Sequence, residues 1–327
     1  MIDLSSIIRR GAVAPPPSLN LSYEIFFEGQ CAKVSEFLQA IPMVKSAPVK
    51  ESPITNAAAQ PIMSASVRNI FGTPAAAAAY DATHSITAYN KTLGNSTFDL
   101  SLSRLGSQFS ALLIDSRATP KGQTSMNPME FMLRATVVNA LRTIDKLIAQ
   151  GTGAEAPVPN FKGLGTLCTA LSRTQGTSGT LELDAQRAIR QITTNGGGAG
   201  EGPQCLIGGP LVLQKLMATT SGQNGLSGFR LDPRTNQTIF HYCGLPYYRC
   251  EVDESSTGRL YAANLGSTGV NLIYGYGSRE TYGLAAESLP VTSLTGSSDV
   301  TVHGAYALAI WEPGAIYEIT GISVAGV

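Results

Sequence analysis

The sequence predicts an α+β fold. Three features support this prediction: one long helical pattern in the middle of the chain, two shorter helical patterns after it, and a C-terminal part rich in strand-like segments. Helical and strand-like segments do not alternate regularly, which argues against a parallel sheet built from βαβ units. With 327 residues, the chain can form one large domain or two modest ones.

The first part of the chain, residues 1–70, has no sustained periodicity. A short amphipathic piece near residues 29–38 could form one or two helical turns. Prolines interrupt the other short runs, at Pro15, Pro16, Pro17, Pro42, Pro48, Pro53 and Pro61. We therefore expect an extended arm that becomes ordered by lying on another surface, such as a neighbouring subunit.

Residues 71–122 contain a strand-like stretch. SITAYN at 85–90 and STFDLSLSRL at 96–105 alternate apolar and polar residues, and KTLGN between them has the glycine and asparagine of a hairpin turn. This pattern predicts a long β-hairpin. Because an isolated hairpin is only marginally stable in water, we expect it to lie against a partner.

The clearest helix is predicted over residues 128–150. Asn127 is suited to the N-cap, Pro128 to the first helical position and Glu130 to the first turn, while Gly151 provides the C-terminal stop. Residues 128–150 would form a rod of about 35 Å. Apolar residues recur every three or four positions, at Met129, Met132, Leu133, Val137, Ala140, Leu141, Ile144, Leu147 and Ile148.

Helical patterns recur at residues 181–194 and 209–219. QCLIGG before the second of these predicts a buried strand, and a glycine run at 195–202 separates the two patterns. Strand-like segments dominate from Thr238 onward. They are TIFHYCGLPYYRCEV, LYAANLG, GVNLIYGYG and VTVHGAYALAIWEPGAIYEITGISV.

Charge is scarce and balanced, with 23 basic and 23 acidic residues, so a dedicated nucleic-acid binder is not expected. Charged residues make up 14% of the chain, and such a weakly polar surface tends to be covered by partners. The five cysteines lack disulfide or zinc spacing and are interpreted as reduced thiols. Neither a signal-peptide core nor an apolar stretch of membrane-spanning length is found.

Motifs for catalysis are missing. The sequence has no nucleophile elbow and no paired-histidine zinc helix, and Gly-Lys never occurs, which excludes a Walker phosphate loop. The nearest approach to a metal cluster is His241 with Cys243 and Cys250, for which strand packing is the simpler interpretation. The glycine run at 195–202 lacks a phosphate-binding context and favours a mobile loop. We expect no catalytic residue, cofactor or metal.

Four stretches together resemble the major capsid proteins of tailed bacteriophages, from about residue 60 to the end. These proteins share the Hong Kong ninety-seven fold with encapsulins and the herpesvirus capsid floor. The stretches are ALRTIDKLIAQGTG followed by FKGLGTL, then YCGLPYYRCEVDE, then AANLGSTGVNLIYGYG, then VTVHGAYALAIWEPGAIYEI.

The resemblance implies a domain organisation. Residues 1–70 would be the N-terminal arm and 71–122 the extended loop, a β-hairpin that reaches over a neighbouring subunit. Residues 123–180 and 295–327 would form the peripheral domain, with 128–150 as its spine helix. Residues 181–294 would form the axial domain at the capsomer centre.

The resemblance also implies a function without enzymatic activity. The chain would assemble with itself into hexamers and pentamers of an icosahedral shell around a double-stranded DNA genome, in a virion assembled in the host cytoplasm. Contact with DNA would be weak and non-specific, and no membrane is involved. Portal and decoration proteins are possible partners, and because the arm is short and poor in charges, scaffolding would come from a separate protein.

Candidate subunit contacts are Arg9, Arg10, Tyr89, Lys91 and Arg104. Lys91 would lie at the hairpin tip, where it could pair with, or be covalently joined to, a neighbouring side chain; a solvated turn lysine is the simpler interpretation. Three alternatives stay open: an encapsulin-type bacterial shell, a hydrolase with an unrecognised site, and a phage tail or decoration protein, for which so long a spine helix would be unexpected.

Overall fold

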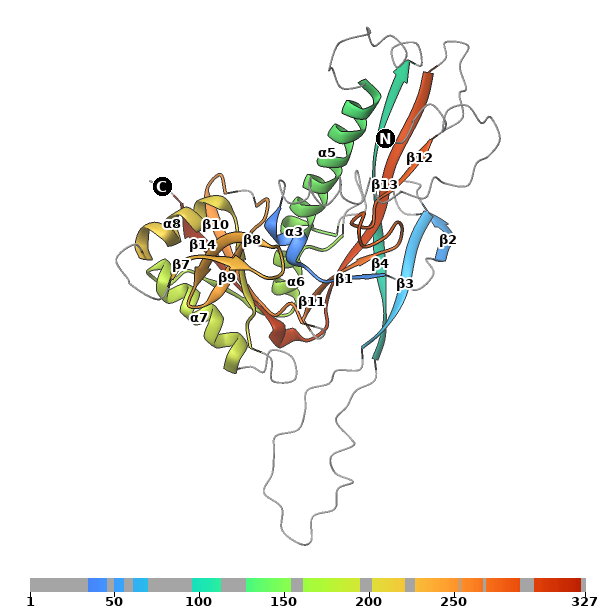
Figure 1. Cartoon of the computed structure of the whole chain (residues 1–327). Coiled ribbons are helices and arrows are strands. Elements are labelled where there is room, and N and C mark those ends of the chain that lie inside the picture. The colour runs from blue at the N-terminus through green and yellow to red at the C-terminus, as the bar shows by residue number, and fades with distance from the viewer. Residues whose placement is uncertain are drawn as a thin grey trace, which may run out of the picture.

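The computed structural model describes residues 35–45, 50–55, 61–69, 96–112, 128–153, 161–194, 202–220, 227–252, 254–266, 269–288 and 297–324. Within them the chain forms two seven-stranded sheets with helices packed against them (Figure 1). The predicted α+β class is confirmed.

The first sheet, called the long sheet below, is elongated and is built around β4 (Figure 1). Its strands in order are β1 (Met43–Lys45), β11 (Val270–Tyr274), β13 (Ser297–Ile310), β4 (Ser96–Leu112), β3 (Pro61–Asn69) and β2 (Lys50–Thr55), and β12 (Ala285–Ser288) also pairs with β13. One half of β4 pairs with β3, from Met63↔Leu102 to Asn69↔Ser96. The other half pairs with β13, so β4 joins the β3–β4 hairpin to the body of the sheet.

The second sheet is mixed. Its strands in order are β5 (Thr174–Gly176), β14 (Ile316–Ser323), β10 (Thr257–Ala263), β6 (Cys205–Gly208), β9 (Leu245–Arg249), β8 (Gln237–Tyr242) and β7 (Ser227–Asp232). Helices α7 (Leu181–Thr194) and α8 (Pro210–Thr220) cover one face. Their buried residues, such as Ala188 and Leu216, pack with Tyr247, Leu260 and Ile319 of the strands.

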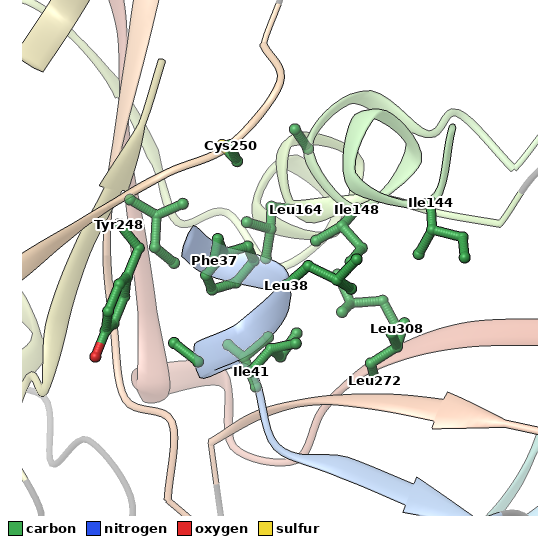
Figure 2. Packing of buried hydrophobic residues seen from close by; sticks show 14 of the residues in the cluster. Phe37, Leu38, Ile41, Ile144, Ile148, Leu164, Tyr248, Cys250, Leu272 and Leu308 are labelled. Carbon is green, nitrogen blue, oxygen red and sulfur yellow. The ribbon is translucent and has the colours of Figure 1, made fainter. Parts of the chain in front are cut away.

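Helix α5 (Pro128–Gln150) has the bounds that its apolar periodicity predicts. Its buried face includes Val137, Leu141, Ile144 and Ile148, which pack with residues of both sheets in one core. Figure 2 shows Ile144 and Ile148 directed toward Leu308 and Leu272 of the long sheet. Helix α5 therefore lies where the two sheets meet.

Two glycines end this helix and begin the next one, α6 (Leu164–Ala170). The Gly163 amide donates to the Gly151 carbonyl at 2.7 Å, and the Gly151 amide donates to Leu147 at 2.8 Å. A β-carbon on Gly151 would lie 2.1 Å from the Phe161 carbonyl oxygen, and one on Gly163 would lie 2.5 Å from that of Leu147. Direct backbone contact thus explains the glycines in this motif.

The YCGL motif forms the tight connection between β8 and β9. His241 pairs with Pro246 and Tyr242 with Leu245, which leaves Cys243 and Gly244 as the turn. Both turn residues have positive φ, 52° and 80°, as a type I′ hairpin turn requires. This twist matches that of the flanking strands.

Several features of the first hundred residues and of β7 differ from the sequence expectation. Helix α3 (Glu36–Ala40) overlaps the helical turns expected near residues 29–38. The arm region also contains strands β1, β2 and β3, although its prolines suggested no strands. The hairpin partner of β4 is β3, whereas the predicted partner, residues 85–90, lies outside the described residues. Strand β7 was not predicted.

Candidate assembly surfaces

The arm residues that the structure describes are anchored in the core. Ser35 caps α3 by accepting the Leu38 amide at 2.9 Å. Phe37 and Leu38 are fully buried, and Ile41 is 3% exposed. Figure 2 shows these side chains beside residues of α5, α6 and the long sheet. This segment is therefore part of the fold's central packing.

Polar contacts at the start of α3 reach distant parts of the chain. The Ser35 hydroxyl donates to Asp145 Oδ1 of α5 at 2.5 Å, and Asp145 Oδ2 accepts the Glu251 amide at 2.6 Å. Glu36 accepts from Arg249 through its Nε at 2.9 Å and its backbone amide at 3.1 Å. Together these bonds tie Ser35 and Glu36 to α5, to the last residue of β9 and to the segment that follows it.

Burial gives Asp145 unusual acid–base behaviour. Loss of hydration raises the pKa of its carboxyl from 3.8 to about 7, although the hydrogen bonds from Ser35 and Glu251 partly lower it. The negative charge of Glu251 adds a smaller increase. Near neutral pH this buried carboxyl is therefore divided between its protonated and ionised forms.

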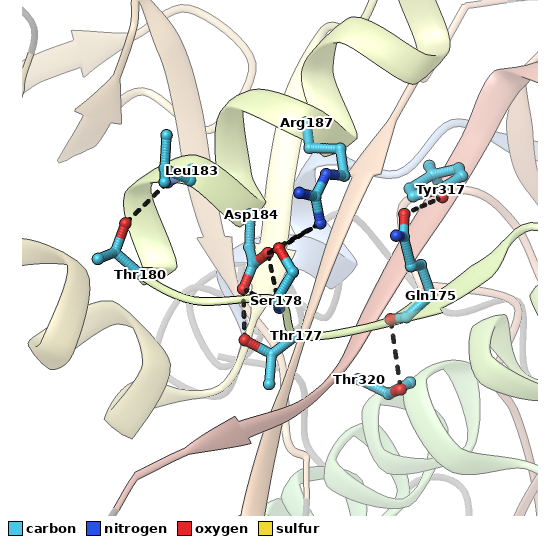
Figure 3. A network of polar contacts seen from close by, with 9 residues as sticks. All are labelled: Gln175, Thr177, Ser178, Thr180, Leu183, Asp184, Arg187, Tyr317 and Thr320. Atoms are coloured by element: carbon cyan, nitrogen blue, oxygen red, sulfur yellow. Dashed lines mark hydrogen bonds and ion pairs between the residues drawn. The ribbon is translucent and has the colours of Figure 1, made fainter.

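The connection between β5 and α7 is held by Asp184, as Figure 3 shows. Its carboxylate accepts the Ser178 amide at 3.2 Å, the Ser178 hydroxyl at 3.0 Å and the Thr177 hydroxyl, and Arg187 approaches at 3.4 Å. A negative charge in the first turn also interacts favourably with the helix dipole. These contacts account for Asp184 as a structural residue.

The amino end of α8 resembles an anion site, but the chain supplies the anion. Glu254 accepts the amides of Leu211 at 2.6 Å and Val212 at 3.0 Å. Gly209 gives the carboxylate room, because a β-carbon there would lie 2.3 Å from Glu254 Cδ. The Tyr247 hydroxyl donates to the Gly209 carbonyl at 2.9 Å. The Glu254 carboxylate therefore occupies the position that an anion would take at the start of α8.

Another buried carboxylate, Glu318, lies on β14. It accepts from Arg259 at 3.1 Å and from Thr174 at 2.8 Å. The nearby Tyr261 hydroxyl is the buried side-chain atom without a hydrogen-bond partner among the described residues. Burial raises the pKa of the neighbouring Cys168 thiol, which disfavours a reactive thiolate. This cluster joins β5, β10 and β14.

Strand β7 presents an apolar surface at the edge of the second sheet, and Phe229 and Leu231 define what is called the β7 patch below. Phe229 is 60% exposed and Leu231 65% exposed. Phe229 pairs directly with the buried Phe240, with ring centroids 5.8 Å apart. The patch thus continues the apolar face that α7 and α8 cover elsewhere. Exposed apolar edge strands are typical of surfaces that associate.

Most of the candidate contacts named from the sequence lie outside the described residues. This applies to Arg9, Arg10, Tyr89 and Lys91. Arg104 lies on β4 opposite Ala305 of β13. The arm anchor and the β7 patch were not predicted, although Ser35 followed by Glu36 is a helix-start signal and GFRL alternates like a strand.

The suggested metal cluster does not form. Cys250 is buried in the core with α5, whereas Cys243 packs against the core on the opposite face of the second sheet. His241 Nδ1 lies 3.2 Å from the Ile239 carbonyl oxygen. In the part of the chain that the structure describes, no three metal-ligating side chains gather, and no helix there has the length and apolar character to cross a membrane.

The sequence matches no family model and no curated protein. Solved structures with similar folds include the SrpI encapsulin of Synechococcus elongatus PCC 7942, at a TM-score of 0.59 and 11% identity, covering 99% of this chain and 97% of that one. A chain of Mycobacterium phage Adephagia has a TM-score of 0.53 at 10% identity, covering 98% and 97%. The capsid of Myoviridae phage XM1 gives 0.51 at 11%, covering 98% and 99%.

Proposed function

We propose that this chain, which has the Hong Kong ninety-seven fold of phage capsids and encapsulins, builds a closed shell from copies of itself. The likeness extends over nearly the whole of this chain and of each shell protein, and this observation carries the proposal.

Three features of the chain support self-assembly. The β3–β4 hairpin extends from the body of the long sheet, residues 35–41 of the arm are anchored in the core, and the β7 patch exposes apolar surface. Extended elements let one subunit reach another at variable angles, as rings of different symmetry require. The apolar patch would be covered by a second copy, since a shell brings many copies together.

The specific form that we propose is the major capsid protein of a tailed bacteriophage. Hexamers and pentamers would close into an icosahedral shell around double-stranded DNA, assembled in the host cytoplasm. The balanced charge, 23 basic and 23 acidic residues, suits a container whose wall holds DNA weakly. Separate scaffolding, portal and decoration proteins would complete the particle.

The domain organisation belongs to the same proposal. Residues 1–70 would form the arm, 71–122 the extended loop, 123–180 with 295–327 the peripheral domain, and 181–294 the axial domain. Arg9, Arg10, Tyr89, Lys91 and Arg104 are the proposed contacts between subunits. Arg9 and Arg10 would lie on the arm and Tyr89 and Lys91 on the loop, whereas Arg104 lies where β4 pairs with β13.

An encapsulin-type bacterial shell is the second candidate, favoured by the likeness to the Synechococcus protein. The contents of native particles distinguish the two. A phage capsid would contain double-stranded DNA, whereas an encapsulin would contain protein cargo.

Sedimentation of the purified chain tests the shell proposal. We expect particles in the megadalton range, alone or with co-expressed neighbouring genes. A variant that begins at residue 34 keeps the Ser35 anchor, so we expect it to fold but not to close into shells. Small compact oligomers from the full-length chain under both conditions would contradict the proposal.

A further inference from the structure

One polar junction links three separate parts of the chain. It consists of Ser35 before α3, Asp145 on α5, and the backbone of Arg249 at the end of β9 and of Glu251 just after it, and is called the Asp145 junction below. Ser35 and Asp145 are 3% and 0% exposed. A change at this junction therefore acts on the arm, the spine helix and the second sheet together.

The Ser35 hydroxyl has two possible acceptors. It donates to Asp145 Oδ1 at 2.5 Å, and the Arg249 carbonyl oxygen lies 3.5 Å away. The Ser35 hydroxyl oxygen itself already accepts the Leu38 amide at 2.9 Å. A serine oxygen has two lone pairs, so one acceptor position remains for a further donor.

These contacts allow two hydrogen-bond arrangements. When Asp145 is ionised, its oxygens accept from Ser35 and from the Glu251 amide. When Asp145 takes a proton from solvent, its hydroxyl donates to Ser35 Oγ, and the Ser35 hydroxyl turns to the Arg249 carbonyl. The buried charge disappears while each donor keeps an acceptor.

We propose that the Asp145 junction is a proton-dependent clasp, which holds residues 35–41 tightly when Asp145 is protonated and loosens when Asp145 ionises. The clasp goes beyond the proposed function by assigning a regulator to the arm. In a shell, it would couple pH to how readily this part of the arm leaves its own subunit.

The charges around Asp145 favour this behaviour. Glu251 is exposed and negative, the buried Cys250 thiol lies close by, and the Arg249 guanidinium is engaged by Glu36. Arg142 and Lys146 of α5 are exposed to solvent. Among the ion pairs of the described residues, none includes Asp145. The ionised carboxylate is thus buried without a paired cation, consistent with its raised pKa.

Loosening would have a large effect because apolar residues follow Ser35 and Glu36 in the sequence. Phe37, Leu38 and Ile41 pack with Ile148, Leu164 and other residues of the central core. Ser35 still donates to the ionised carboxylate, so the loosening comes from the buried charge, which opening of residues 35–41 returns to water. Opening also breaks the Ser35 cap on the first turn of α3. The apolar side chains of the segment would then separate from the core as one unit.

Hydrogen exchange of the full-length chain between pH 5 and pH 8 tests the clasp. After correction for intrinsic exchange rates, we expect opening of residues 36–41 to increase about tenfold or more from pH 5 to pH 7 and then level off. Asp145→Asn places an amide in the protonated arrangement, so its opening should not vary with pH. Asp184→Asn removes a buried carboxyl outside the junction, and although it weakens the β5–α7 connection, opening of residues 36–41 should keep its wild-type dependence on pH.

A wild-type profile that does not change with pH would overturn the proposal, as would the same slope in Asp145→Asn. If Asp145→Asn does not fold, the pH dependence of opening in the wild-type chain decides the test alone. Hydrogen exchange is measured on unassembled chains and therefore does not depend on shell formation. A negative result for the clasp would leave the shell proposal standing, and the absence of shells would leave the clasp proposal standing.

Discussion

The Ser35 hydroxyl lies 2.5 Å from the Asp145 carboxylate, although the two residues are 110 positions apart in the sequence. Their contact fixes the place where the arm enters the body of the protein. Because Phe37 and Leu38 lie two and three residues after Ser35 and are fully buried, residues 35–41 are an integral part of the core.

Replacement of Phe37 by alanine tests this anchoring. Loss of a fully buried aromatic side chain should lower the free energy of unfolding by about 3 to 5 kcal/mol. Leu183→Ala is the control, because Leu183 is 58% exposed, and it should change the value by less than about 0.5 kcal/mol. Urea unfolding measures both. Equal effects would show that the arm lies outside the cooperative unit.

The raised pKa of Asp145 predicts how its contribution to stability depends on pH. The folded-state pKa of about 7 exceeds the ordinary value of 3.8, so between these values the folded chain holds a proton that the unfolded chain lacks. The stability that this proton gives the folded chain falls as pH rises from about 4 to about 7, and it is lost above about pH 7. Asp145→Asn removes it, so the variant should gain about 2 to 3 kcal/mol relative to wild type between pH 5 and pH 8. Urea unfolding at pH 5 and pH 8 measures the difference in unfolding free energy between the variant and wild type. The same difference at both pH values would contradict this prediction.

Replacement of Gly209 by alanine should disturb the start of α8. The new β-carbon would lie 2.3 Å from Glu254 Cδ and displace the carboxylate from two helix amides. We expect a loss of about 2 kcal/mol in unfolding free energy. Gly228→Ala is a matched control, since nothing lies within 4 Å of a β-carbon there. The two variants are compared by thermal unfolding, and similar midpoints would refute the role given to Gly209.

The β7 patch should contribute to assembly and little to the stability of the single chain. Phe229→Ser combined with Leu231→Ser removes apolar surface that is already 60% and 65% exposed. We expect unfolding to change by less than about 1 kcal/mol, while the yield of large particles falls strongly. Thr238→Ala changes an exposed residue that pairs with Leu231, and should assemble normally. Normal particle yield from the double variant, measured by light scattering, would exclude the patch as a contact.

Elements with a strong local pattern could be predicted from the sequence. Helix α5 has the predicted bounds because its apolar positions recur along one face and Gly151 ends it. Helix α7 agrees for the same reason, and the buried strand β6 follows from its continuous apolar run. In each case the signal and the element occupy the same residues.

Features that depend on long-range pairing could not be predicted in this way. Strand β4 pairs with β3 and β13, and local alternation does not specify either partner. The prolines of the arm hid β2 and β3, because an edge position or irregular pairing tolerates proline. The Ser35–Asp145 contact likewise has no local signal. The predicted division into arm, loop, peripheral and axial domains stays a prediction.

Electron microscopy of the purified full-length chain, alone and co-expressed with its neighbouring genes, tests the central claim most directly. We predict closed icosahedral particles, or the hexameric and pentameric rings from which they are built. Only small compact oligomers under both conditions would contradict the claim and favour the hydrolase alternative.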